Sequence, residues 1–244
     1  MIDVTPAKLS LRGRGAGVHG RLDLPVGSGG CAGTTVRESV AVSGRRPYTG
    51  TPRHREGRLM QVHELVARCA AAAREEDSMN AVRAVMEEWR SDLGAVERAL
   101  AFIPGVGGNA RQVFYRSPDL TMLKVCFPCG RRTPPHDHGT WAVILDLSGQ
   151  EKNTLYRRDG GGLRTASEVT LERGAILPMR AETAHVAECV GDVPAIGLHV
   201  YGGDILELPR RMWDPETLEE HVFEDTLYET FAQTASKAEA APRR

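Results

Sequence analysis

The sequence has little cysteine, no long apolar run and no excess of positive charge. Its five cysteines are an odd number among 244 residues, and no apolar secretory leader precedes them, which argues against a disulfide framework and for a reducing, cytoplasmic location. No apolar run approaches the roughly 18 residues of a membrane helix, so no membrane association is expected. The 31 Lys and Arg residues are balanced by 32 Asp and Glu residues, which argues against nucleic acid as a partner.

This balance of charge hides a boundary near residue 59. Residues 1–59 contain ten Lys and Arg residues against four Asp and Glu, and they hold 11 of the 26 glycines. They show no sustained apolar period of 2 or 3.6, so they lack a face that folding could bury. We expect a disordered Gly/Arg-rich leader, or an upstream start codon read through, rather than a targeting or RNA-contacting tail. Periodic sequence begins at Met60, and residues 60–244 are expected to form a single domain.

Apolar periodicity predicts two amphipathic helices within residues 61–103. Apolar residues recur at i, i+3, i+4 and i+7 in two stretches, which are Val62, Leu65, Val66, Cys69 and Val82, Val85, Met86, Trp89. From Arg111 the sequence changes to short runs of β-branched, aromatic and Leu residues separated by Gly, Pro and Asp. Such runs predict strands, near residues 112–116, 121–128, 140–147, 152–158, 168–171, 175–178, 184–190 and 195–201. Their spacing is typical of a small barrel or sandwich.

A last helix is predicted over residues 214–236. Asp214 and Pro215 match the N-cap and the first position of a helix, where the missing N–H of proline is tolerated. The mainly β region is therefore expected to lie between N-terminal helices and a C-terminal helix.

Histidines gather in the predicted strands. His136 and His138 form an HxH motif, and residues i and i+2 of an extended strand face the same side about 6–7 Å apart, so both imidazoles can reach one metal ion while Asp137 points away. His185 and His199 lie on later strands, and either is a possible third ligand on ligand chemistry alone. A single CxxC, Cys126 to Cys129, has no second pair and is better explained by a turn at a strand end than by a zinc site.

These motifs resemble those of the cupin barrels. The first cupin motif is matched by Gly130, His136, His138 and Gly149, and the second by Gly174, Pro178 and His185. The Glu ligand that usually follows the second His is absent, since Ala142 and Val143 stand there. With the segments His136-Asp-His-Gly-Thr-Trp141 and Leu198-His-Val-Tyr-Gly202, this three-His variation resembles the cysteine dioxygenase family of thiol dioxygenases, and among them the bacterial cysteine and 3-mercaptopropionate dioxygenases. The resemblance covers about residues 111–212 and implies a cupin double-stranded β-helix, or jelly-roll barrel.

The resemblance also implies roles for individual residues. The metal ligands would be His136, His138 and His185, holding Fe(2+), with His199 and Tyr201 as catalytic residues beside the metal. The partners would be a small thiol and O₂, and the product a sulfinic acid. The family usually places a Ser two residues before the second-sphere His, and Gly197 stands there in this chain.

A carboxylate-bearing thiol calls for an arginine, because a planar guanidinium binds a carboxylate through two parallel hydrogen bonds. The resemblance to mercaptopropionate-type enzymes indicates Arg210, and the resemblance to cysteine-type enzymes indicates Arg116, while Arg211 is a further candidate. Two other functions stay open: a metal-dependent cupin of other chemistry, such as an isomerase or a different dioxygenase, and a non-catalytic cupin that binds a small molecule. We expect a monomer or a small homo-oligomer.

Overall fold

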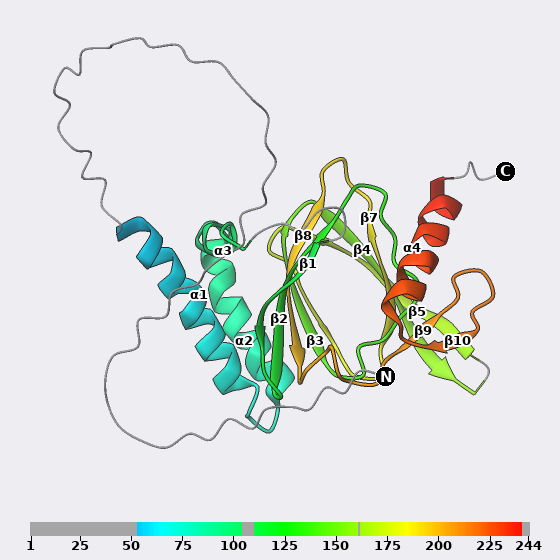
Figure 1. Ribbon diagram of the computed structural model, residues 1–244, viewed down its shortest axis with the longest axis horizontal. Helices are drawn as coiled ribbons and strands as arrows, with labels where there is room; N and C mark the ends of the chain where they lie inside the picture. The colour runs from blue at the N-terminus through cyan, green and yellow to red at the C-terminus, as the bar shows by residue number, and fades with distance from the viewer. Residues whose placement is uncertain (1–52, 104–109, 161, 241–244) are drawn as a thin grey trace, which may run out of the picture. The chain divides into compact units, whose positions relative to one another are not determined.

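A computed structural model of the chain describes residues 53–103, 110–160 and 162–240 (Figure 1). Most of the predicted leader lies outside these residues. The described chain starts within α1 (Arg53–Ala72), so the first helix begins seven residues before Met60, where we had expected the folded region to start. No helix among the described residues is both long enough and apolar enough to cross a membrane.

Two antiparallel sheets form the barrel. The larger has the strand order β1 (Ala110–Arg116), β2 (Leu120–Phe127), β8 (Ala195–Gly202), β3 (Ala142–Ser148), β6 (Ile176–Met179). The smaller has the order β5 (Gly162–Glu172), β4 (Gln150–Asp159), β7 (Ala184–Cys189). Every predicted strand is present, with ends that differ from the prediction by several residues in β5 and by fewer elsewhere.

The order of the strands is that of a jelly roll. The chain passes repeatedly from one sheet to the other, and the segment around residues 132–136 adds a further member to the smaller sheet through bridges from Arg132 to Glu188 and from His136 to His185. Eight strands in two antiparallel sheets, with the chain exchanging between the sheets at each step from β3 to β8 except that from β4 to β5, are the jelly-roll, or double-stranded β-helix, arrangement. The predicted fold class is therefore confirmed.

Strand β3 shows why the barrel has two separate cores. Alternate side chains of a strand point to opposite faces of the sheet. Val143 and Leu145 belong to one buried cluster with residues of the helices, whereas Ala142 and Ile144 belong to the cluster inside the barrel with Tyr201. Because both faces are buried, this strand is an almost continuous apolar run.

The N-terminal helices cover the outer face of the larger sheet (Figure 1). Leu65 of α1 and Met86 of α2 (Ser78–Trp89) are fully buried against strand residues such as Met122. The structure has a third helix here, α3 (Leu93–Leu100), after a short 3-10 turn. Its N-cap is Asp92, whose carboxylate accepts a hydrogen bond from the Ala95 amide at 2.9 Å.

The predicted helix over 214–236 is wrong in its first eleven residues. Here the chain forms a small hairpin of β9 (Arg211–Trp213) and β10 (Glu220–Val222), and α4 begins at Asp225 and ends at Ala240. Asp214 does accept hydrogen bonds from the Glu216 and Thr217 amides, as an N-cap would. Leu218 then adopts a positive φ of 59°, which turns the chain back instead of continuing a helix.

Candidate metal centre

The HxH motif lies in the segment between β2 and β3 that runs beside β7. The His136 amide donates to the His185 carbonyl at 3.0 Å, and the His185 amide donates back to the His136 carbonyl at 2.8 Å. Asp137, one residue on, faces the other way, where its carboxylate accepts from the Arg211 amide and pairs with Arg158. The alternation predicted for this motif is therefore present.

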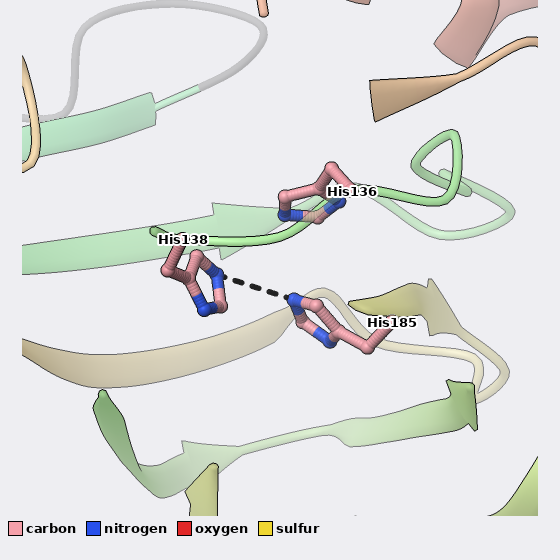
Figure 2. Close-up of side chains that lie close together, drawn as sticks. All are labelled: His136, His138 and His185. Carbon is pink, nitrogen blue, oxygen red and sulfur yellow. Dashed lines mark hydrogen bonds between the residues drawn. The ribbon is translucent and has the colours of Figure 1, made fainter. Parts of the chain in front are cut away.

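Three imidazoles converge inside the barrel (Figure 2). His136, His138 and His185 are all buried, and one ligand atom from each lies within 4.8 Å of the others. The Nε2 atoms of His138 and His185 are 3.3 Å apart. Two nitrogens that each bind one ion at about 2.1 Å are about 3.0–3.4 Å apart when the angle between them is near octahedral or tetrahedral, so this pair already has the spacing of two metal ligands.

Contacts behind two of the rings orient them for ligation. The Nδ1–H of His136 donates to the Pro134 carbonyl at 3.0 Å, and the Nδ1 of His185 lies 2.8 Å from Oδ1 of Asn153. Asn153 donates its own amide to Glu151, so its oxygen faces His185 and accepts the Nδ1–H. In both rings the free lone pair is therefore on Nε2, as in metal sites where a second group fixes the histidine tautomer.

Burial keeps these histidines neutral. It lowers the pKa of His136 and of His138 well below the ordinary range, and it lowers the pKa of His185 to about 4. The neutral imidazole is the form that binds a metal, so the site needs no deprotonation at neutral pH. The residues present can hold a metal ion, and they offer it three nitrogens and no carboxylate.

His199 is the fourth histidine of the barrel interior, and it lies outside the group of three. On β8 its Nδ1 is 3.1 Å from the Tyr201 hydroxyl. The Tyr201 ring in turn meets His138 edge-on, with ring centroids 4.9 Å apart. Burial raises the pKa of the Tyr201 phenol and lowers the pKa of His199 to about 3. Tyr201 therefore presents a neutral phenol beside the histidine group, with His199 behind it.

A cavity of about 200 Å³ joins these groups. The three histidines, His199 and Tyr201 line it, together with Asp225 and Tyr228 of α4. The remaining wall is mostly apolar, with contributions from Val113, Leu123, Val125, Phe127, Ala187, Ile205 and Leu206. Two guanidinium groups, those of Arg111 and Arg210, also line it. No cysteine of the described residues does.

The two arginines differ in the groups that they contact. Arg111 pairs with Asp225 at 3.0 Å. Arg210 stacks on the Phe223 ring, with its guanidinium carbon 3.6 Å from the ring centroid, and forms no ion pair with any described carboxylate. Burial lowers the pKa of Arg210, although the group remains a cation. Arg210 is thus the cation in the cavity that is best placed to receive an anionic ligand.

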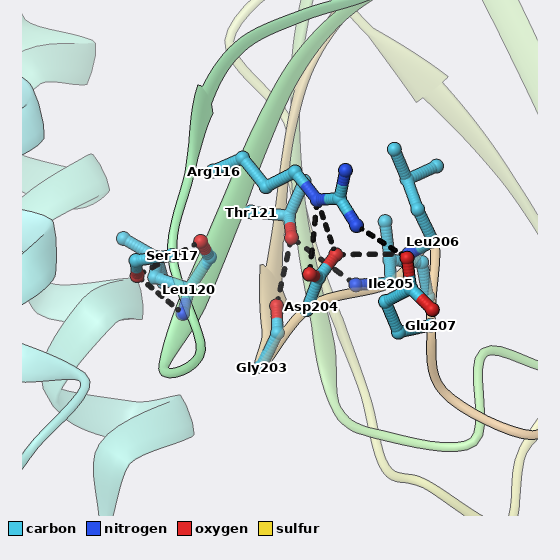
Figure 3. A network of polar contacts seen from close by, with 9 residues as sticks. All are labelled: Arg116, Ser117, Leu120, Thr121, Gly203, Asp204, Ile205, Leu206 and Glu207. Atoms are coloured by element: carbon cyan, nitrogen blue, oxygen red, sulfur yellow. Dashed lines mark hydrogen bonds and ion pairs between the residues drawn. The ribbon is translucent and has the colours of Figure 1, made fainter. Parts of the chain in front are cut away.

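Arg116, the alternative suggested by the cysteine-type enzymes, does not line the cavity. Figure 3 shows its guanidinium bound to the carboxylates of Asp204 and Glu207, each at 2.8 Å. A substrate carboxylate would have to displace both acids. Arg211 is also absent from the cavity wall, and it lies 3.5 Å from Glu220 in the hairpin.

Two cavity residues were missed in the sequence. Arg111 shares a strand face with Val113, so extending the predicted strand by one residue and following its period of 2 would have found it. Tyr228 meets the His136 ring edge-on with centroids 5.3 Å apart. It belongs to α4, and no local pattern in the sequence indicates that this helix returns to the mouth of the barrel.

Comparison with known proteins finds solved structures that are similar in fold. No family model matches the chain. Similar solved structures include an RmlC-like cupin with a double-stranded beta-helix fold from Methanocaldococcus jannaschii, 11% identical, covering 42% of this chain and 87% of that one with a TM-score of 0.36. A double-stranded beta-helix protein from Klebsiella pneumoniae is 19% identical, covering 50% and 89% with a TM-score of 0.33. Hydroquinone 1,2-dioxygenase from Sphingomonas sp. TTNP3 is 13% identical, covering 38% and 64% with a TM-score of 0.33. At such identities nothing about activity follows for this chain.

Proposed function

We propose that this protein is an iron(II)-dependent thiol dioxygenase that converts a small carboxylate-bearing thiol and O₂ into the sulfinic acid, RSH + O₂ → RSO₂H. The observation that carries the proposal is the composition of one cavity. It is lined by three neutral imidazoles that converge with no carboxylate in their group, and by a phenol that contacts a further imidazole. It is also lined by an arginine that forms no ion pair with a described carboxylate.

Three neutral ligands leave the charge of a bound divalent ion undiminished. Iron(II) held by His136, His138 and His185 would supply open coordination positions and a net charge of +2, which favours a thiolate over a thiol and allows sulfur and O₂ to meet at one centre. A carboxylate ligand would cancel part of that charge. The absence of an acid from the histidine group therefore favours an anionic sulfur substrate.

Arg210 would fix the other end of the substrate. Its guanidinium can donate two parallel hydrogen bonds to a carboxylate, and stacking on Phe223 limits its rotation. The cavity volume of about 200 Å³ equals six or seven water molecules at about 30 Å³ each. That volume suits a substrate of the size of cysteine or 3-mercaptopropionate.

Tyr201 would serve the reacting end. Its ring contacts that of His138, so its hydroxyl is placed to hydrogen-bond a group held beside the histidines. The raised pKa of the phenol keeps it protonated, so its hydroxyl orients a bound group by hydrogen bonding and can exchange a proton with His199. The apolar wall excludes competing water.

The test is metal analysis followed by oxygen uptake. Purified protein reconstituted with iron(II) should consume O₂ with cysteine or 3-mercaptopropionate, and the product should gain two oxygen atoms from ¹⁸O₂ by mass spectrometry. Cysteamine, which lacks a carboxylate, should be a poorer substrate. Iron-loaded protein that consumes no O₂ with any of these thiols would contradict the proposal. If it binds them without oxidising them, a non-catalytic binding protein is the better description.

A further inference from the structure

A buried acid lies behind the catalytic groups and has no role in the mechanism described so far. Glu151 of β4 is only 1% exposed, and no Lys or Arg of the described residues pairs with it. Its Oε1 accepts a hydrogen bond from the Asn153 amide at 2.8 Å. Its Oε2 faces Nε2 of His199 at 3.9 Å. Burying a carboxylate is costly unless hydrogen bonds stabilise it, so the contacts to Asn153 and His199 bear on its role.

The Nε2 of His199 is the complementary feature. It is buried and has no hydrogen-bond partner among the described residues, while Nδ1 of the same ring contacts the Tyr201 hydroxyl at 3.1 Å. A neutral imidazole carries one proton, on one nitrogen or the other. With the proton on Nδ1, the Nε2 lone pair would face the oxygen of Glu151. With the proton on Nε2, the N–H points at that oxygen and Nδ1 accepts the Tyr201 proton.

Gly197 makes the approach possible. A Cβ at this position would lie 2.9 Å from Nε2 of His199 and 3.1 Å from its Cδ2, closer than real contacts allow. The imidazole therefore lies in the space that a side chain at position 197 would need. The missing Ser does not leave the ring without a neighbour, because Glu151 from the opposite sheet faces the same nitrogen.

We propose that Glu151 is a positioning residue that holds His199 as its Nε2–H tautomer, so that Tyr201 donates to Nδ1 and turns its oxygen lone pairs toward the cavity. The role of Tyr201 in this inference rests on the proposed function, whereas the tautomer does not. The 3.9 Å separation exceeds a direct hydrogen bond, and a small rotation of the ring toward Glu151 would bring the two atoms within hydrogen-bond distance.

The same carboxylate also reaches the metal centre. Because Oε1 of Glu151 requires a donor, it fixes the orientation of the Asn153 amide, whose oxygen then accepts the Nδ1–H of His185. One buried acid thus sets the proton positions of a candidate ligand and of the residue behind Tyr201.

The experiment reads the tautomer directly. The full chain, labelled with ¹⁵N-histidine and loaded with diamagnetic zinc(II), is examined by long-range ¹H–¹⁵N correlation, and the His199 signals are assigned by their loss in His199→Gln. In the wild type we expect Nε2 protonated and Nδ1 unprotonated. Glu151→Leu should shift the population toward Nδ1–H, and Glu151→Gln, which keeps one acceptor oxygen for the two donors Asn153 and His199, should restore Nε2–H only in part. Asp146→Asn removes the neighbouring buried acid and should leave the tautomer unchanged.

Kinetics then separate positioning from folding. In the iron-loaded protein Glu151→Leu should lower kcat about 10–100-fold, the range for groups that orient catalytic or ligating side chains. KM should change little, and Glu151→Gln should recover kcat only in part. A wild-type His199 protonated on Nδ1, or an Nε2–H tautomer that persists in Glu151→Leu, overturns the inference. If the zinc-loaded wild type shows the expected tautomer but the iron-loaded wild type oxidises no thiol, the proposed function is contradicted instead.

Discussion

At the scale of single residues, the four buried histidines should separate into ligands and a non-ligand. His185→Ala removes one of three convergent nitrogens, and the protein should then retain less than about a tenth of its bound iron, because removing a ligand opens the site. His199→Ala should retain iron, since His199 lies outside the group, while activity falls. Iron content by plasma emission spectroscopy after dialysis checks both variants. Loss of iron in His199→Ala with retention in His185→Ala would show that the third ligand is His199.

The substrate carboxylate gives a second test at this scale. Arg210→Ala should raise KM for 3-mercaptopropionate about 10–100-fold, because a charge-assisted hydrogen bond pair contributes about 1.5–3 kcal/mol. KM for cysteamine should change little, since that thiol has no carboxylate. Arg211→Ala is the matched control, because Arg211 is exposed and lies outside the cavity. Equal effects of Arg210→Ala on both thiols would remove Arg210 from the substrate site and make Arg111 the next candidate.

Residue-level patterns in the sequence predicted part of this site. The HxH spacing identifies two residues on one strand face, and this alternation follows from backbone geometry alone. The choice between His185 and His199 could not be made in the same way, because it depends on which strands pair. His185 lies opposite His136 across a bridge, and that contact joins residues far apart in the chain. The ion pairs of Arg116 with Asp204 and Glu207 could not be predicted either, because they also join residues far apart in the chain.

At the scale of elements, the turn between β3 and β4 depends on Gly149. Its φ is +81°, and an added Cβ would lie 2.5 Å from the Pro194 carbonyl oxygen. Gly149→Ala should therefore lower the free energy of unfolding by about 2–4 kcal/mol, from the strained backbone together with overpacking. Gly160→Ala is the control, because no heavy atom lies within 4 Å of the added Cβ there. Urea unfolding measures both, and equal midpoints for the two variants would contradict the argument.

The hairpin between the barrel and α4 shows where element prediction fails. Asp214 and Pro215 carry the local chemistry of a helix start, and the Asp214 side chain does accept two backbone amides. Local capping is equally compatible with a turn, and the outcome is decided by partners elsewhere: the Asp137 amide donates to the Arg211 carbonyl, and the Trp213 amide donates to Pro135. The barrel strands were predictable because each is a short run of β-branched, aromatic and Leu residues between turn residues, which is a local signal.

At the scale of the whole molecule, the described region should fold without residues 1–52. That segment has no periodic apolar face, whereas α1 places Leu65 and Cys69 in the core. A chain that begins at Arg53 should melt within about 2 °C of the full chain, and it should bind the same amount of iron. Differential scanning calorimetry of both chains measures this. A clear fall in the melting temperature would mean that the first 52 residues contribute to the stability of the barrel.

The buried titratable groups should give the metal-free protein a stability maximum in mildly acidic solution. Burial raises the pKa of Asp146 and that of Glu151 to about 7. Between about pH 4 and 7 these two acids bind more protons in the native state than in the unfolded state, so their contribution to the free energy of unfolding falls as pH rises. Burial lowers the pKa of all four barrel histidines, that of His185 to about 4 and that of His199 to about 3, so their contribution falls as pH drops below about 6.5. Four histidines outweigh two acids below that pH, and only the acids act above it, which places the maximum near pH 6.5.

Substitution of Asp146 should reduce the loss of stability at alkaline pH and leave the loss at acid pH unchanged. Asp146 has both carboxylate oxygens buried without a hydrogen-bond partner among the described residues, so its charged form has little to stabilise it. The change in the free energy of unfolding caused by Asp146→Asn in metal-free protein should be at least about 1 kcal/mol more favourable at pH 8 than at pH 5. At pH 8 the wild type must bury a charged carboxylate, whereas the asparagine variant buries a neutral amide. Urea midpoints at the two pH values measure this difference. An identical effect of the substitution at both would mean that Asp146 ionises in the barrel as readily as in the unfolded chain, and that water reaches this part of the interior.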